Sequence, residues 1–105
     1  MTTSAISATA DPAHALTFDV VVRDARGESR HRVTMQPDEA QRWAELGAEP
    51  LHCVHAAMMF LLDREPKEAI LRAFDMRVIR RYFPEFDDAF PGYLARPGAK
   101  PGSGP

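Results

Sequence analysis

The chain has 105 residues, of which 45% are hydrophobic and 27% charged, and its formal net charge is −2. This length fits one domain with a modest core, and the near-neutral charge excludes binding to polyanions through bulk charge alone. The single cysteine, Cys53, excludes an intramolecular disulfide and fits a reducing compartment. No apolar run approaches the roughly 20 residues that span a bilayer, and the first residues lack a signal-peptide pattern, so we expect a cytoplasmic protein without membrane contact.

The two ends of the chain differ in composition from its middle. Residues 1–14 are small and polar, and we expect them to form a disordered N-terminal tail. Residues 95–105 are rich in Pro and Gly without any periodicity, which predicts a flexible C-terminal tail. The composition therefore predicts one folded domain over residues 15–94.

The domain begins with a predicted β-hairpin. Residues 16–23 and 29–35 both alternate apolar and polar side chains, as half-buried strands do. The Asp24-Ala25-Arg26-Gly27 stretch between them has the composition of a tight turn in which Gly27 takes a positive φ. Because two strands alone are marginal and leave both edges open, we expect a homodimer formed through the hairpin edge.

Two helices are predicted after the hairpin. Pro37 fits the first turn of a helix and Gly47 fits its C-terminal end. Pro50 starts a second helix with an apolar stripe that runs to Leu62, and Pro66 disfavours helix at the residue before it.

Two more helices are predicted over the following residues. Pro66 fits the first position of a third helix, whose inward-facing residues would be Ile70, Leu71 and Phe74. Asp75 is a candidate N-cap for a fourth helix over residues 76–83, which Pro84 ends. The expected fold class is therefore α+β, with an N-terminal antiparallel β-hairpin followed by three to four short helices.

The His52-Cys53-Val54-His55 stretch contains ligand types that zinc prefers. A structural zinc site needs four ligands and a catalytic one needs three, and the sequence offers only the distant His14 and His31 in addition. We therefore predict no metal and no cofactor, and we interpret Cys53 as a small buried hydrophobe. A metal or thiol site at His52, Cys53 and His55 is an alternative.

An arginine-rich face is the sharpest functional feature of the sequence. Arg77, Arg80 and Arg81 fall on one side of the predicted fourth helix, and Arg64 and Lys67 lie a short way before them. Guanidinium groups bind carboxylates or phosphates in a bidentate manner. Residues 64–81 therefore predict either a surface that binds an acidic protein partner or, as the alternative, an interface for nucleic acid.

The segment 83–94 carries several aromatic residues among prolines and acidic residues, and we interpret it as a loop. If Phe86, Phe90 and Tyr93 are exposed together, they add a contact surface for a partner protein. The other interpretation is that these rings seal the core.

Residues 62–86 resemble a small bacterial protein family with the closing pattern REPKE.IL..FD..VI.RYFPE. The resemblance implies an architecture that begins with two strands, and it implies no activity, cofactor or partner. The His52–His55 stretch lies outside this pattern, which lowers the weight of a metal site there.

No catalytic motif, metal fingerprint or phosphate-binding loop occurs in the sequence. The function predicted is a small non-enzymatic binding or regulatory module that acts through protein–protein contacts with a partner or with itself. Its expected binding residues are Arg64, Lys67, Arg77, Arg80, Arg81, Phe86, Phe90 and Tyr93.

Overall fold

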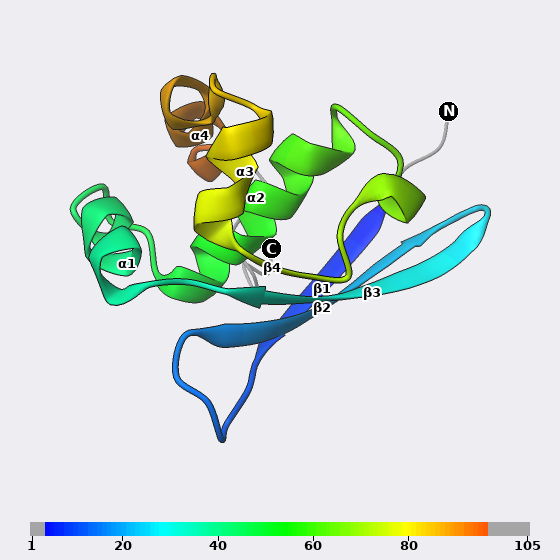
Figure 1. Ribbon diagram of the computed structural model, residues 1–105, viewed down its shortest axis with the longest axis horizontal. Coiled ribbons are helices and arrows are strands. Elements are labelled where there is room, and N and C mark those ends of the chain that lie inside the picture. The colour runs from blue at the N-terminus through cyan, green and yellow to red at the C-terminus, as the bar shows by residue number, and fades with distance from the viewer. Residues whose placement is uncertain (1–3, 97–105) are drawn as a thin grey trace.

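The computed structural model describes residues 4–96, and all helices of this range lie on one face of a four-stranded sheet (Figure 1). The strands are β1 (Ala5–Ala10), β2 (Thr17–Asp24), β3 (Gly27–Thr34) and β4 (Ala73–Asp75). The helices are α1 (Pro37–Ala44), α2 (Pro50–Leu62), α3 (Met76–Tyr82) and α4 (Phe86–Leu94), with a 3₁₀ helix at Lys67–Ala69. The α+β class is confirmed. Among residues 4–96 no helix is long and apolar enough to span a bilayer.

The predicted hairpin is present as β2 and β3, which pair in antiparallel register from Thr17 opposite Thr34 to Asp24 opposite Gly27. Gly27 takes a φ of 126°, which other residues rarely adopt. The side chains of Phe18, Val20 and Val33 point to the helix side and are buried. The alternation read from the sequence therefore identified the core face of the hairpin.

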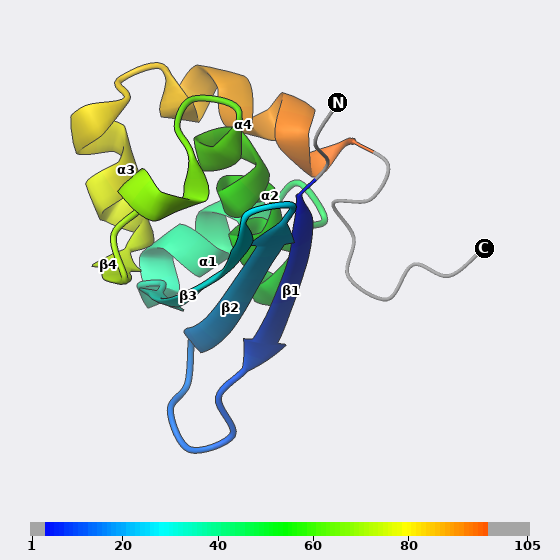
Figure 2. The ribbon, with the colours of Figure 1, turned by 90° about the vertical axis from the view of Figure 1, so that its right-hand side faces the viewer.

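Residues 5–10 form strand β1, which corrects the expected disordered tail over residues 1–14. Strand β1 pairs with residues 18–23 of β2 in antiparallel register (Figure 2). Its residues are too small to signal a strand by composition, but Ile6 and Ala8 pack against the core from this position. Backbone pairing with β2, together with these two contacts, offsets the weak local propensity.

Helices α1 and α2 begin at the predicted prolines, Pro37 and Pro50, which occupy the first turn of each helix. Gly47 follows α1 with a φ of 82°, and its N–H donates to the carbonyl of Ala44. Helix α2 is buried along most of its length and forms the centre of the helical layer (Figure 1).

The predicted third helix is wrong. The chain after Pro66 makes only the 3₁₀ turn and then runs extended into β4, which pairs in parallel with Arg32–Thr34 of β3. Extended residues alternate between two sides, so Ile70 is buried whereas Leu71 is 49% exposed. Tertiary pairing with β3 therefore overrides the helical spacing of the apolar residues.

The fourth predicted helix is present as α3, and Asp75 caps it by accepting a hydrogen bond from the N–H of Arg77. The expected loop over residues 83–94 instead contains helix α4. Its apolar residues Phe86, Phe90 and Leu94 recur at helical spacing and are buried, which offsets the presence of Pro91 inside the helix. The predicted C-terminal tail lies outside the described residues from position 97 onward.

Most of the hairpin edge has a partner strand within residues 4–96, and homodimerisation through the hairpin edge stays a prediction. Strand β1 covers the outer edge of β2, and β4 covers Arg32–Thr34 of β3. The uncovered part of β3 is short and carries the charged residues Glu28 and Arg30. Within residues 4–96 the strand edges without a partner strand are those of β1, of β4 and of residues 27–31 of β3.

Candidate functional site

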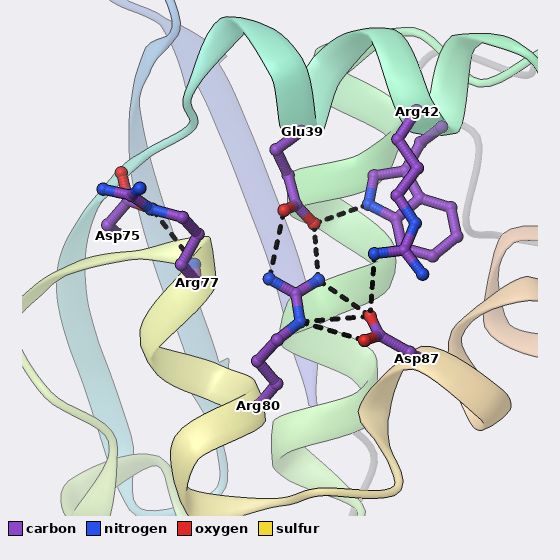
Figure 3. Close-up of polar contacts among 7 residues, drawn as sticks. Glu39, Arg42, Asp75, Arg77, Arg80 and Asp87 are labelled. Carbon is purple, nitrogen blue, oxygen red and sulfur yellow. Dashed lines mark hydrogen bonds and ion pairs between the residues drawn. The ribbon is translucent and has the colours of Figure 1, made fainter.

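Arg80 lies between two helices and is bound by carboxylates on both sides (Figure 3). Its Nη1 and Nη2 donate to Glu39 of α1 at 3.1 and 2.8 Å, and its Nε and Nη2 donate to Asp87 of α4. Glu39 also accepts a 2.7 Å hydrogen bond from Nε1 of the buried Trp43. The hydrogen bonds that Arg80 donates to Glu39 and Asp87 raise the pKa of Arg80 above its ordinary value. Arg80 therefore joins α1, α3 and α4 and is not available to a partner.

Arg64 is also occupied within the chain. Its Nε donates to Glu85 at 3.0 Å, its Nη1 donates to the hydroxyl of Tyr93 at 3.2 Å, and its guanidinium lies 3.6 Å from the ring centroid of Phe60. These contacts fix the end of α2 against α4.

Lys67 is almost completely buried, with 2% of its side chain exposed. Its Nζ donates to Asp24 at 2.9 Å and to Glu68, and these hydrogen bonds, led by that of Asp24, raise the pKa of Lys67. Lys67 thus holds the 3₁₀ turn against the hairpin turn and does not face a partner.

Arg77 and Arg81 remain on the surface of α3. The Nε of Arg77 lies 3.3 Å from Asp75, with more than half of the side chain exposed. Arg81 is exposed, and no ion pair is recorded for it among residues 4–96. The expected arginine face is thus divided, with Arg80 turned inward and Arg77 and Arg81 turned outward.

The aromatic side chains of α4 do not form an exposed surface, which corrects that expectation. Phe86 and Phe90 are fully buried and Tyr93 is 7% exposed. Phe90 stacks on Phe86 at 4.6 Å and meets the edge of Trp43 at 4.8 Å. These rings seal the core between α1, α2 and α4.

The His52–His55 stretch lies on α2 and is turned inward. His52 Nε2 donates to the carbonyl of Leu94 at 2.9 Å, so this nitrogen has no lone pair for a metal. Burial, followed by the charge of Glu39, raises the pKa of Cys53 to about 12, which keeps the thiol protonated at neutral pH. Nδ1 of His55 is buried without a hydrogen-bond partner. No cluster of three metal-ligating side chains occurs within the described range 4–96.

A polar cleft of about 430 Å³ lies between β3 and the segment that precedes β4. His31 lines it, and its Nδ1 donates to the carbonyl of Leu71 at 2.8 Å while Nε2 accepts from the Ser29 hydroxyl at 2.7 Å. The cleft also contains Lys67 and Arg30, but each of these cations is paired with a neighbouring carboxylate. These hydrogen bonds and ion pairs position the extended segment, and the exposed Arg72 also lines the cleft.

An apolar groove of about 320 Å³ lies between the end of α2, the extended segment and α3, and we call it the α2–α3 groove. Two large hydrophobic side chains line it while remaining exposed, Leu71 at 49% and Tyr82 at 67%. Leu46 is the other large hydrophobic residue exposed within the described range, and it lies elsewhere. The full lining comprises Leu61, Glu65, Ala69, Ile70, Leu71, Phe74, Val78, Ile79, Tyr82 and Phe83.

Arginine residues of α3 neighbour the groove residues in sequence, while the one charged residue in the lining is Glu65. On α3, Val78 and Tyr82 line the groove at positions i and i+4, and Arg81 precedes Tyr82 on the neighbouring side of the helix. Arg72 directly follows Leu71 in the extended segment, but it lines the polar cleft beside β3 and not this groove. Arg77 lies one turn before Arg81. Arg81 is therefore the exposed cation next to the groove residue Tyr82 on α3.

The spacing of apolar residues predicts Leu71 and Phe74 inside a helix, so the sequence pattern does not reveal this groove. The available signal was the apolar pair Val78 and Tyr82 beside Arg77 and Arg81 on a short helix. Only the extended path of residues 70–74 reveals that these side chains share a groove with Leu71.

Comparisons with protein-family models, with curated proteins and with solved structures give no match to this chain. The resemblance of residues 62–86 to a bacterial family therefore stays a prediction.

Proposed function

We propose that the protein is a binding module that docks an apolar segment of a partner protein, flanked by carboxylates, into the α2–α3 groove. The observation that carries this proposal is the convergence of the exposed Leu71 and Tyr82 side chains on one groove. A contiguous exposed apolar patch with a polar rim is typical of a protein interaction site. The groove is about as large as the smallest ligand pockets of proteins.

The exposed cation next to the groove supports an acidic partner. Arg81 is exposed and directly precedes the groove residue Tyr82, and guanidinium groups pair with carboxylates in a fixed bidentate geometry. Apolar side chains of the partner would fill the groove, and its carboxylates would reach Arg81. Of the binding residues predicted from the sequence, this proposal keeps Arg77 and Arg81. The apolar contacts predicted for the aromatic rings of α4, which are buried, are assigned to Leu71 and Tyr82.

The proposal can be tested by selecting binders from a display library of random 12-residue peptides with the full-length protein. Enriched peptides should combine two or three apolar residues with aspartate or glutamate. Their affinity is then measured by fluorescence polarisation with synthetic, labelled peptides at low and high salt.

Two variants make the experiment specific for the groove. Ala69 is exposed and lines the groove, so Ala69→Trp should fill it and weaken peptide binding at least tenfold. Leu46→Ala removes an exposed apolar side chain away from the groove and serves as the matched control with unchanged affinity. Selected peptides that bind Ala69→Trp as tightly as the unchanged protein would refute the proposal.

The same assay addresses the alternative of nucleic-acid binding through residues 64–81. Phosphate contacts predict an affinity for a short duplex or single strand that falls steeply with the logarithm of salt concentration. Salt-dependent binding to an oligonucleotide, combined with no peptide enrichment, would favour the alternative over the peptide-binding module.

A further inference from the structure

Within residues 4–96, the outer edge of strand β1 has no neighbouring strand (Figure 2). The N–H of Asp11 donates to the carbonyl of Thr17, its partner across the antiparallel pair. Because every second residue of an antiparallel strand hydrogen-bonds to the same neighbour, residues 5, 7 and 9 also direct their backbone groups toward β2. By alternation, the backbone N–H and C=O groups of Ile6, Ala8 and Ala10 point away from the sheet. The groups of Ala8 and Ala10 offer a template for another strand, whereas the carbonyl of Ile6 accepts a hydrogen bond from His55 of α2.

The sequence of β1 lacks the features by which proteins block such pairing. Residues 5–10, Ala-Ile-Ser-Ala-Thr-Ala, contain no charge, no proline and no glycine. Natural edge strands are normally short or carry charges, prolines or bulges. The opposite edge illustrates this, because β4 has only three residues and contains Asp75, which is engaged by Thr34 and Gln36.

We infer that β1 pairs with β1 of a second copy of this chain in antiparallel orientation, which gives a continuous eight-stranded sheet around a twofold axis. Self-pairing brings no like charges together, because the strand has none. On the helix side, Ile6 and Ala8 of both copies would extend the apolar layer, while Ser7 and Thr9 would line the solvent side. A twofold contact between identical edges closes on itself and does not propagate into a fibre.

The dimer would have a consequence for binding. The α2–α3 groove contains Phe74 of β4, which lies at the opposite edge of the sheet from β1. In the dimer the two β4 strands are separated by seven strand spacings, roughly 34 Å. Two outward grooves at this separation would allow one partner with two acceptor segments to bind with higher apparent affinity than a single segment. The dimer itself does not depend on the proposed groove function.

The inference is tested by sedimentation equilibrium of the full-length protein between 1 and about 500 μM, where the concentration range covers weak dimers. We expect the mass to rise with concentration from the 11.7 kDa of one chain toward twice that value. Ser7→Lys places a charge on the exposed face of β1, and Ala8→Pro removes an outward N–H that does not serve the pairing with β2. Each should weaken self-association at least tenfold.

Ala73→Lys introduces the same charge as Ser7→Lys at the opposite edge, and it should leave self-association unchanged. Circular dichroism of both lysine variants establishes that each remains folded, which keeps the comparison valid if Ala8→Pro disrupts the strand. A monomeric mass of the unchanged protein over the whole concentration range would overturn the inference. Association that persists in folded Ser7→Lys, or that Ala73→Lys abolishes to the same extent, would also overturn it.

Discussion

Replacing Arg80 by methionine should destabilise the protein strongly, although Arg80 belongs to a helix with other arginines on its surface. The guanidinium provides five hydrogen bonds to Glu39 and Asp87. In Arg80→Met the Glu39 side chain, only 5% exposed, would keep a single donor, Nε1 of Trp43. Asp87 is one-third exposed and can be solvated instead.

Removing one partner of a buried ion pair costs about 3–5 kcal/mol, and the lower end applies here because Arg80 itself is a quarter exposed. We therefore expect Arg80→Met to lower the free energy of unfolding by about 3 kcal/mol. For a domain of this size the loss corresponds to a fall in Tm of roughly 12–24 °C. Urea unfolding followed by the fluorescence of Trp43, the single tryptophan, measures it directly.

A double-mutant cycle separates the ion pair from general packing effects. In Glu39→Gln the neutral amide no longer requires a cation, so adding Arg80→Met should cost at least about 1.5 kcal/mol less than it does in the unchanged protein. Arg81→Met is the matched control and should stay within about 0.5 kcal/mol of the unchanged protein. The stabilising role of the ion pair would be refuted if Arg80→Met lowered the free energy of unfolding by less than about 1 kcal/mol. It would also be refuted if the effects of Arg80→Met and Glu39→Gln were strictly additive.

Three further predictions concern buried side chains. Because burial raises the pKa of Cys53 to about 12, a disulfide reagent at pH 7 should leave the native thiol unmodified and label it after unfolding in urea, and rapid native labelling would contradict this. Burial lowers the pKa of His55, so below about pH 6.5 the unfolded chain binds more protons than the folded chain, and the free energy of unfolding should fall as the pH decreases. In His55→Gln the free energy of unfolding should depend less steeply on pH. An equal pH dependence in both proteins would contradict the lowered pKa of His55. Phe90→Ala should lower the free energy of unfolding by about 3–5 kcal/mol, whereas Tyr82→Ala, on the surface, should stay within about 0.5 kcal/mol, and similar losses in both would be inconsistent with the core.

The parts of the fold that the sequence predicted are those with a local physical cause. The alternating pattern around Val20, the turn at Gly27 and the prolines that open α1 and α2 each restrict the backbone or one face of it within a few residues. Asp75 was identified as a helix cap for the same reason.

The parts that it missed depend on distant residues. Strand β1 has small side chains and is stabilised by its pairing with β2, which no local pattern reveals. Residues 73–75 pair in parallel with β3, forty positions earlier, and this contact converts an expected helix into a strand. Helix α4 was hidden by Pro91, although the spacing of Phe86, Phe90 and Leu94 was a usable helical signal.

In the candidate site, too, features with a local cause could be predicted from the sequence, and features that depend on distant residues could not. Exposure of Arg77 and Arg81 could be read from helical spacing, but the carboxylates that occupy Arg80 come from α1 and α4. Ion-pair partners at such separations in sequence are set by tertiary packing, so the division of the arginine face became visible only in the folded chain.

The most direct test of the central claim is an NMR titration of the isotope-labelled, full-length protein with the tightest peptide from the display selection. The account predicts that the largest changes in chemical shift occur at residues of the α2–α3 groove, led by Leu71, Val78 and Tyr82, and that they vanish in Ala69→Trp. Changes centred instead on the solvent face of the sheet or on α1, with the groove unaffected, would contradict it.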